Sequence, residues 1–390
     1  MIIAGAGGLV DFDAENTYSG DTILEGATLD ADFGVGIHDS SRLHFNGAGS
    51  ITAGTPLALG STGTLLQSED VTARRVGNRE FEIKWSGSGG FASADADGIT
   101  VNLGEVMAGV GQDLDWGAEG FFEGATDSVL TFGSELTQGR INFANDVDIG
   151  GDLNASVAVY NSGSQSAKDT AILSGNWTGA SLTIGDAATP YDGTVFMTGN
   201  NALESVNILG GDVRTQNPDD AGDFGTLLDP SAALTVGEGA SLYLYGDEQS
   251  ASIVVDAATT AGEDDGQLWL LGEMDTGTVE NSGWLVVDSG TAITGTDDGL
   301  GNPIETSGSL SATGTIDNTV DGIVLQKGAI SATGTATNDG HWEVVGERTL
   351  SVGGLDGAGT FCLESANASS PSCGGGAGGT ELSAAGLTLE

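Results

Sequence analysis

The chain has 390 residues, of which 66 are glycine and only 6 are proline. It carries 56 acidic and 10 basic residues, so its formal net charge at pH 7 is −46. This charge excludes the usual kind of nucleic-acid binder and argues against docking on anionic lipid, because phosphate groups would be repelled over nearly the whole surface. Hydrophobic residues make up 38% of the chain, which is enough for a large core, so the chain is not a disordered acidic tail.

The N-terminal residues Met1 to Ala4 are apolar, but they lack a basic segment and are soon followed by Asp11. We therefore do not expect a signal peptide. No apolar run approaches the roughly 18 residues that span a membrane, so we expect no membrane insertion of this segment. The chain is interpreted as a mature region or a fragment of a longer protein.

Short segments of alternating apolar and polar residues recur along the chain, bounded by Gly, Asn or Asp. Examples are residues 22–24, 99–103, 129–132, 181–184, 234–236 and 241–245. Apolar residues at the spacing of an amphipathic helix are scarce. The pattern predicts many short strands and an all-β protein.

Two similar blocks, residues 85–91 and 116–122, each begin with Trp and end with Phe, and they start 31 residues apart. Each block leads into a predicted strand that ends in glycine. Because this spacing exceeds the repeat length found near the C-terminus, we expect longer rungs with protruding loops over residues 85–160. The acidic stretches 217–223, 262–266 and 296–303 are interpreted as further insertions, so one domain is predicted for residues 1–390.

A repeat of 20 residues marks the C-terminal part of the chain. Residues 308–315 return as residues 328–335, and residues 348–354 follow another 20 positions later, so Leu310, Ile330 and Leu350 share one phase. This period predicts a β-solenoid of about 20 residues per rung, because a single rung cannot bury its apolar residues and stacked rungs can. A β-sandwich is the alternative, but it would not hold apolar positions in phase at this offset. Residues 300–390 are expected to contain the most regular rungs.

The two cysteines, Cys362 and Cys373, are separated by ten residues rich in Ser, Ala and Gly. One close pair in a chain poor in lysine indicates an exported protein with a small disulfide loop. Two unpaired thiols are the alternative.

Several segments resemble the passenger regions of Gram-negative autotransporters that contain autotransporter-associated β-strand repeats. Residues 16–23, Asn-Thr-Tyr-Ser-Gly-Asp-Thr-Ile, followed by Gly26-Ala-Thr-Leu29, are similar to the repeat itself. The blocks 85–91 and 116–122, with residues 139–143 and 146–151, are similar to the segments that accompany it. The resemblance is good over residues 16–160 and compositional beyond them.

This resemblance implies a right-handed parallel β-helix displayed on, or shed from, the outer surface of the cell. Members of the family are often adhesins. The chain departs from the family pattern because it contains neither the C-terminal membrane barrel nor an export signal, which we attribute to its being a fragment.

Residue patterns of catalytic and metal sites are missing. His38, His44 and His341 have no zinc spacing, and there is no nucleophile elbow or phosphate-binding loop. Carboxylate pairs occur at 95/97, 219/220, 264/265 and 297/298, and we interpret them as solvated turn residues, with glycan cleavage as the alternative. No catalytic, cofactor-binding or metal-ligating residue is therefore predicted, although Ca²⁺ at the turns 95–98 and 264–266 is an alternative.

Four of the ten basic residues, Arg74, Arg75, Arg79 and Lys84, lie within eleven positions. They are interpreted as neutralising acidic neighbours on adjacent rungs, with an anion site as the alternative. Four tryptophans are predicted to fill the core or close its ends, with sugar stacking on the surface as the alternative. They are Trp177, Trp269, Trp284 and Trp342.

Taken together, these features predict a cell-surface or secreted adhesin of a Gram-negative bacterium without enzymatic activity. Its expected partners are surface glycans, matrix or neighbouring cells, and self-association is also considered. A polysaccharide-acting β-helix enzyme and a structural surface-layer or filament protein are the alternative functions.

Overall fold

The computed structural model describes residues 1–5, 7–51, 57–58, 60–104, 111–125, 127–163, 167–186, 191–258, 264–291, 305–345 and 348–364. In these ranges the regular elements are β-strands and one 3-10 turn, η1 (Ala167–Asp169), and no α-helix occurs. The predicted all-β class is therefore confirmed. Whereas the sequence predicts one domain, the fold groups into two compact units: unit 1 comprises residues 1–203 with 209–212, and unit 2 comprises residues 204–208 with 213–390.

Unit 1 is built from parallel strands that form three sheet faces. The first face has the order β1 (Ile2–Ala4), β3 (Thr22–Glu25), β5 (Leu43–Phe45) and β7 (Ile83–Trp85). The second contains β2 (Leu9–Asp11), β4 (Thr28–Asp30), β6 (Gly63–Gln67), β8 (Gly89–Ser93), β11 (Leu130–Phe132), β13 (Val147–Val159) and β15 (Trp177–Ile184), with β10 (Leu114–Trp116) beside β13. The third contains β9 (Ile99–Val101), β12 (Ile141–Phe143), β14 (Thr170–Leu173) and β16 (Thr194–Met197).

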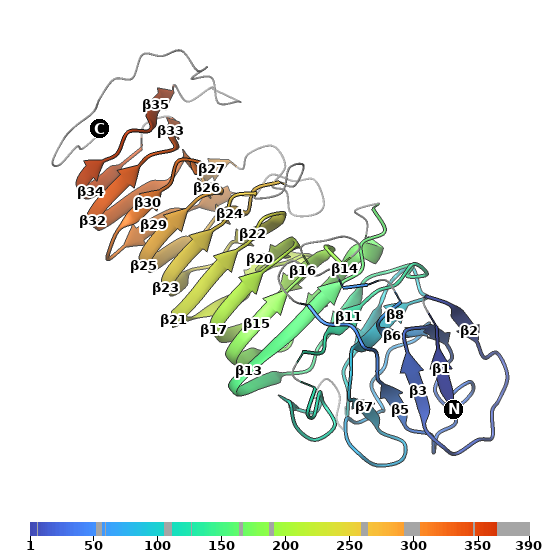
Figure 1. Ribbon diagram of the computed structural model, residues 1–390. Coiled ribbons are helices and arrows are strands. Elements are labelled where there is room, and N and C mark those ends of the chain that lie inside the picture. The colour runs from blue at the N-terminus through green and yellow to red at the C-terminus, as the bar shows by residue number, and fades with distance from the viewer. Residues whose placement is uncertain are drawn as a thin grey trace. The chain divides into compact units, whose positions relative to one another are not determined.

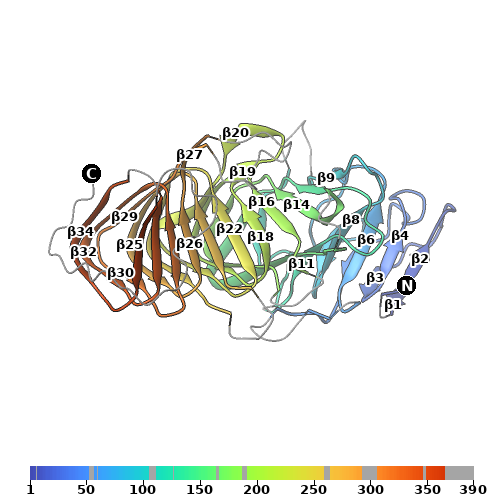
Figure 2. The same ribbon diagram turned by 90° about the horizontal axis from the view of Figure 1, so that it is seen from above.

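Unit 2 has two parallel faces and two antiparallel hairpins (Figure 1). Its first face contains β21 (Thr226–Val236), β23 (Glu248–Val255), β25 (Glu273–Asn281), β29 (Ser309–Ala312), β30 (Ile316–Asn318), β32 (Ala329–Asn338) and β34 (Leu350–Asp356). Its second face contains β22 (Ala240–Leu244), β24 (Gln267–Leu270), β26 (Trp284–Val287), β31 (Ile323–Gln326), β33 (His341–Val345) and β35 (Thr360–Glu364). The hairpins, visible at the edge of unit 2 in Figure 2, are β19 (Gln216–Asn217) with β20 (Asp220–Phe224) and β27 (Ser289–Thr291) with β28 (Glu305–Ser307). The unit boundary falls within β17 (Asn200–Ile208) and β18 (Gly211–Arg214).

The predicted column of apolar side chains is present in unit 2. Leu310 pairs in register with Ile330, and Ile330 pairs with Leu350. All three side chains are 1% exposed, so they are buried one above the other. Strands of successive rungs are parallel and hydrogen-bonded to one another, which is the arrangement of a parallel β-helix. The predicted fold is thus confirmed, including rungs of 20 residues in this part of the chain.

Rungs in unit 1 are longer where register partners lie further apart in the sequence. Leu130 pairs with Gly89, 41 positions earlier, and Ile141 pairs with Ile99, 42 positions earlier. Because a rung uses few residues in its strands, the remainder of each interval forms loops around the sheets.

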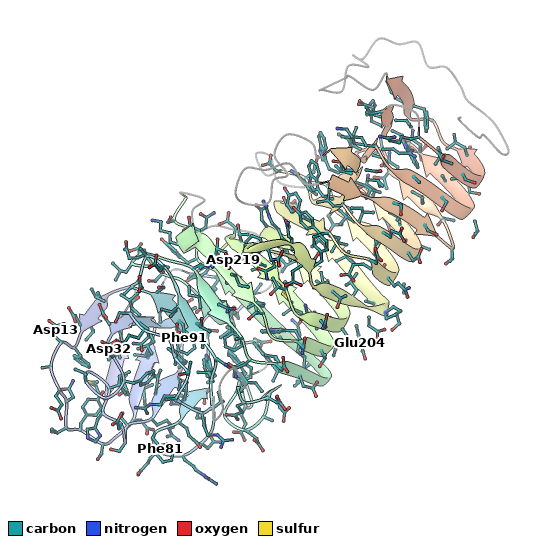
Figure 3. The ribbon with its side chains drawn as sticks, turned by 180° about the vertical axis from the view of Figure 1, so that it is seen from behind. Asp13, Asp32, Phe81, Phe91, Glu204 and Asp219 are labelled. Carbon is teal, nitrogen blue, oxygen red and sulfur yellow. The ribbon has the colours of Figure 1, made fainter. Side chains whose placement is uncertain are left out.

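Aromatic residues fill the core of unit 1. The two Trp-to-Phe blocks pack on each other, with the Trp85 and Phe121 ring centroids 5.3 Å apart, and Trp116 stacks on Phe122 at 4.1 Å. Phe91 is fully buried, whereas Phe81 is 53% exposed. Figure 3 labels both residues. The similarity of the two blocks therefore reflects a shared place in the core.

A ladder of buried asparagines runs through the corner between the two faces of unit 2. The Nδ2 atom of Asn281 donates to Oδ1 of Asn318, and Nδ2 of Asn318 donates to Oδ1 of Asn338, both at 2.7 Å. The amide of Asn318 also donates to the backbone carbonyls of Gly322 and His341. Asn318 is fully buried, so these bonds replace its contacts with water. The 20-residue spacing of Asn318 and Asn338 in the sequence has this structural cause.

Close stacking of the rungs also explains part of the glycine content. A Cβ atom at Gly328 would lie 2.0 Å from the carbonyl oxygen of Gly308, and one at Gly340 would lie 2.2 Å from that of Gly322. No side chain fits at these positions, because each backbone rests directly on the rung before it.

Among the described residues, no helix is long and apolar enough to cross a bilayer.

Candidate functional site

The first face of unit 2 carries a column of short polar side chains that point away from the core. Its members pair in register from rung to rung and are exposed or half-buried: Gln249, Asp275, Ser311, Ser331 and Ser351. Adjacent parallel strands are spaced about 4.8 Å apart. The column therefore repeats a hydrogen-bonding group at a constant interval.

A second column of the same face is acidic. Glu280 pairs with Asp317, Asp317 pairs with Thr337, and Thr337 pairs with Asp356. The strands of this face contain no Lys or Arg. We call the two columns together the polar face. It offers hydroxyl and carboxylate groups, so it accepts hydrogen bonds and repels anions.

The second face of unit 2 presents an aromatic ladder. Tyr243 pairs in register with Trp269, and their rings stack with centroids 5.6 Å apart at 19°. The guanidinium of Arg214 lies 4.7 Å from the Tyr243 centroid. Both faces of Tyr243 are thus covered by protein, which leaves its ring edge and not its face to a sugar.

The other predicted tryptophans are placed as follows. Trp177 and Trp342 are fully buried, as the core interpretation predicts. Trp284 is half-buried and pairs in register with Gln267 and Ile323. Two of the four tryptophans therefore fill the core, whereas Trp269 and Trp284 lie half-buried on the outward side of β24 and β26.

Unit 1 contains a cavity of about 120 Å³ above the outer side of its second face. Thr28 and Thr64, which pair in register on β4 and β6, lie on one side of it. Tyr160, Tyr191 and Thr62 form another wall, and residues 133–136 a third. An engineered apolar cavity of about 150 Å³ holds benzene, so this one has room for a somewhat smaller group.

The two tyrosines of this cavity are held at right angles. Their ring centroids lie 5.9 Å apart with an interplanar angle of 81°. The hydroxyl groups of Tyr191 and Thr62 are 3.2 Å apart and share a hydrogen bond across 129 positions of sequence. Leu57, Val129 and Ala158 pack against the tyrosines in a small outer core.

Carboxylates create a negative potential around these phenols. Burial, followed by the charges of Glu135 and Asp169, raises the pKa of Tyr160. Burial also raises the pKa of Tyr191, with smaller contributions from Asp186 and Glu135, while its bond to Thr62 lowers it. Among the described residues that line the cavity, none is Lys, Arg or His.

Another buried ionisable group lies in unit 2. Glu248 is 4% exposed, and its carboxylate accepts hydrogen bonds from the backbone N–H groups of Leu227 at 2.7 Å and Leu228 at 3.2 Å. Burial raises its pKa from 4.5 to about 7, although the two N–H groups lower it. Neither Glu248 nor the tyrosine cavity is predicted from the sequence, because no motif or spacing distinguishes these residues.

Of the carboxylate pairs that the structure describes, Asp95, Asp97 and Asp219 lie at bends or turns, Asp220 begins β20, and Asp264 and Asp265 lie in an irregular segment. Exposed Asp95 accepts the N–H of Asp97 through Oδ1, and Asn217 accepts the N–H of Asp219 in the same way. Asp265 accepts the N–H of Ala258. The contacts of Asp95 and Asp219 fit the interpretation as turn residues, that of Asp265 spans seven positions, and the pair 297/298 lies outside the described residues.

The basic cluster divides into one buried and three outer residues. Arg74 donates to the carbonyl oxygens of Ser41 at 2.9 Å and His38 at 3.4 Å, and its Nη2 atom lies 3.8 Å from Asp39 Oδ1. Its guanidinium also lies 4.5 Å from the centroid of the Phe33 ring. Burial lowers the pKa of Arg74. Arg74 therefore holds loops of neighbouring rungs together.

Each of the three histidines has different neighbours. Nδ1 of His38 hydrogen-bonds with Ser40, and Nε2 of His341 lies 3.7 Å from Oε2 of Glu343. Burial, followed by the charges of Lys84 and Arg42, lowers the pKa of His44. Within the described ranges, no three His, Cys, Asp or Glu side chains gather in a metal-binding arrangement.

Cys362 is buried in β35 at 3% exposure. Cys373 lies outside the described residues, so the Cys362–Cys373 bridge stays a prediction.

No protein family, curated protein or solved structure matches the chain.

Proposed function

We propose that this chain is a non-catalytic adhesin, displayed at or released from the surface of a Gram-negative bacterium, and that it attaches to neutral glycans through the polar face of unit 2. The supporting observation is the register of Gln249, Asp275, Ser311, Ser331 and Ser351. Sugar hydroxyls donate hydrogen bonds, and this column offers an acceptor at every rung. The absence of Lys and Arg from these strands disfavours anionic glycans and matrix polymers.

Attachment by such a face is multivalent. Each Ser or Asp contributes one weak contact, but a polymer that binds one rung places its next sugars close to the following rungs at a high effective concentration. Short side chains also lose little conformational entropy when they become ordered. The proposed mechanism therefore requires a stiff stack of rungs and no deep pocket.

The test measures adhesion of beads coated with the chain to immobilised mannan and dextran. Ser331→Lys with Ser351→Lys places long cationic side chains in the column, and we expect at least a tenfold loss of bead retention. Ser241→Lys with Thr360→Lys is the matched control, because it makes the same charge change on the second face of unit 2. Retention should also rise steeply with the density of the chain on the beads. Wild-type beads that bind neither polymer, or a Ser331/Ser351 variant that binds as well as the control, would refute the proposal.

A further inference from the structure

The tyrosine cavity of unit 1 has the features of a binding site that the proposed adhesion does not use. Its walls come from segments far apart in the sequence, since residues 7–9, 26–28, 60–64 and 133–136 meet Tyr160 and Tyr191 there. The polar face lies in unit 2, so the cavity is a separate feature of the molecule. Its chemistry is what identifies the class of ligand.

Tyr160 and Tyr191 both line the cavity, and their rings pack edge to face on each other. The quadrupole of an aromatic ring makes its face negative, and a cation within about 6 Å of the ring centroid is stabilised. Tyr160 and Tyr191 are 5.9 Å apart at 81°, and Thr62 fixes the orientation of Tyr191 through their shared hydrogen bond. Both phenol rings thus line the cavity in positions that their mutual contact and the Thr62 hydrogen bond hold in place.

The charged groups around the cavity indicate which charge its ligand carries. Glu135 lies on the wall with an exposed side chain, and it acts on both phenols together with Asp169 or Asp186. Asp169 accepts hydrogen bonds from Ser162, and Asp186 accepts one from the N–H of Leu57, so these two carboxylates are held by the protein. The one charged side chain among the described lining residues is the carboxylate of Glu135, so the charge at the cavity favours a cation over an anion.

We infer that this cavity binds a small alkylammonium group, which the rings of Tyr160 and Tyr191 and the carboxylate of Glu135 would surround. The volume of about 120 Å³ fits one such group and is too small for an oligosaccharide. A phosphocholine headgroup is disfavoured, because no cationic side chain is present to match its phosphate. The ligand is therefore a free amine or quaternary ammonium compound.

The test is isothermal titration calorimetry of the whole chain with tetramethylammonium chloride, compared with sodium chloride at equal ionic strength. We expect saturable binding of one tetramethylammonium ion per chain that weakens as ionic strength rises. Glu135→Gln should weaken binding about fivefold, and Tyr160→Leu should weaken it by a similar factor. Glu273→Gln is the matched control, since it removes an exposed charge from β25 in unit 2.

Two further titrations distinguish the ligand classes. Methyl glucoside tests a neutral sugar, and phosphocholine tests a zwitterionic headgroup. Tetramethylammonium that fails to bind, equal binding to the Glu135→Gln and Glu273→Gln variants, or stronger binding of methyl glucoside or phosphocholine would each overturn the inference. Unchanged circular dichroism of Glu135→Gln would show that its effect does not come from unfolding. Adhesion to mannan should persist in this variant, so failure here is distinguishable from failure of the proposed adhesion.

Discussion

Replacement of Glu248 by Gln tests the coupling between burial and protonation in unit 2. The carboxylate of Glu248 is almost completely buried and accepts N–H groups of Leu227 and Leu228. Gln has nearly the same shape and keeps one carbonyl oxygen as an acceptor, but it carries no charge at any pH. The variant therefore removes the titration and leaves the packing in place.

The magnitude follows from the two protonation equilibria. Burial raises the pKa of Glu248 from 4.5 to about 7 in the folded chain, whereas the unfolded chain keeps a value near 4.5. Between pH 4.5 and 7 the folded form is protonated and the unfolded form is ionised, so unfolding releases a proton. The unfolding free energy must then fall as pH rises through this window, by about 3 kcal/mol for the whole interval. Below pH 4.5 and above pH 7 this group adds no pH dependence.

Urea unfolding followed by tryptophan fluorescence at pH 4.5, 5.5, 6.5 and 7.5 measures this effect. Because many other carboxylates titrate in the same range, the quantity of interest is the unfolding free energy of the wild type minus that of Glu248→Gln. We expect this difference to fall by about 3 kcal/mol from pH 4.5 to 7.5. Glu273→Gln, which removes an exposed charge, is the control for the charge change itself.

A difference that stays constant over this pH range would refute the reasoning. The carboxyl ¹³C resonance of Glu248, assigned by its loss in Glu248→Gln, gives an independent check. A titration midpoint near 4.5 would show that burial does not govern this group. A midpoint near 7 with no pH-dependent difference in stability would show that the unfolded chain retains the same environment.

Three other substitutions test how the rungs are held together. Asn318→Ala should destabilise unit 2 by about 2–3 kcal/mol, because it leaves buried amide groups on both neighbouring rungs without their partner. The midpoint of urea unfolding measures this loss, and an unchanged midpoint would show that water enters the ladder. Gly328→Ala should lower the free energy of unfolding by about 2 kcal/mol or more, because its Cβ would lie 2.0 Å from a carbonyl oxygen. Gly150→Ala is its control and should be nearly neutral, since no atom lies within 4 Å of a Cβ there. Equal melting temperatures for these two variants would contradict the close stacking. Arg74→Ser should lower the unfolding free energy of unit 1 by about 1–3 kcal/mol, and Arg75→Ser, at an exposed position, should leave it nearly unchanged.

The regular part of the fold could be predicted because stacking imposes periodicity on the sequence. Leu310, Ile330 and Leu350 recur at one interval since each must lie on the one before it. The corner ladder was visible as the spacing of Asn318 and Asn338, although its continuation to Asn281 was hidden by an interval of 37 positions.

The cavity and the buried carboxylate could not be predicted for a physical reason. Insertions in unit 1 bring Thr62 and Tyr191 together from 129 positions apart, and no period relates residues on different insertions. Glu248 is one of 56 acidic residues, and only its burial against two N–H groups distinguishes it. The sequence also could not decide whether Trp269 and Trp284 pack within the protein or stack on sugars at its surface. The alternation of a strand assigns a residue to its outward side, but it does not say what covers the ring.

The column of apolar side chains and the Asn318–Asn338 pair of the asparagine ladder repeat at the same interval of 20 residues. This shared interval has an evolutionary consequence. An in-frame duplication of residues 309–328 would insert an extra rung whose Leu, Asn and Gly fall into line with those already present. Each such copy would lengthen unit 2 by one strand spacing, about 4.8 Å, with no compensating substitution. Recombination between neighbouring repeats can therefore adjust the length of this unit while it keeps folding.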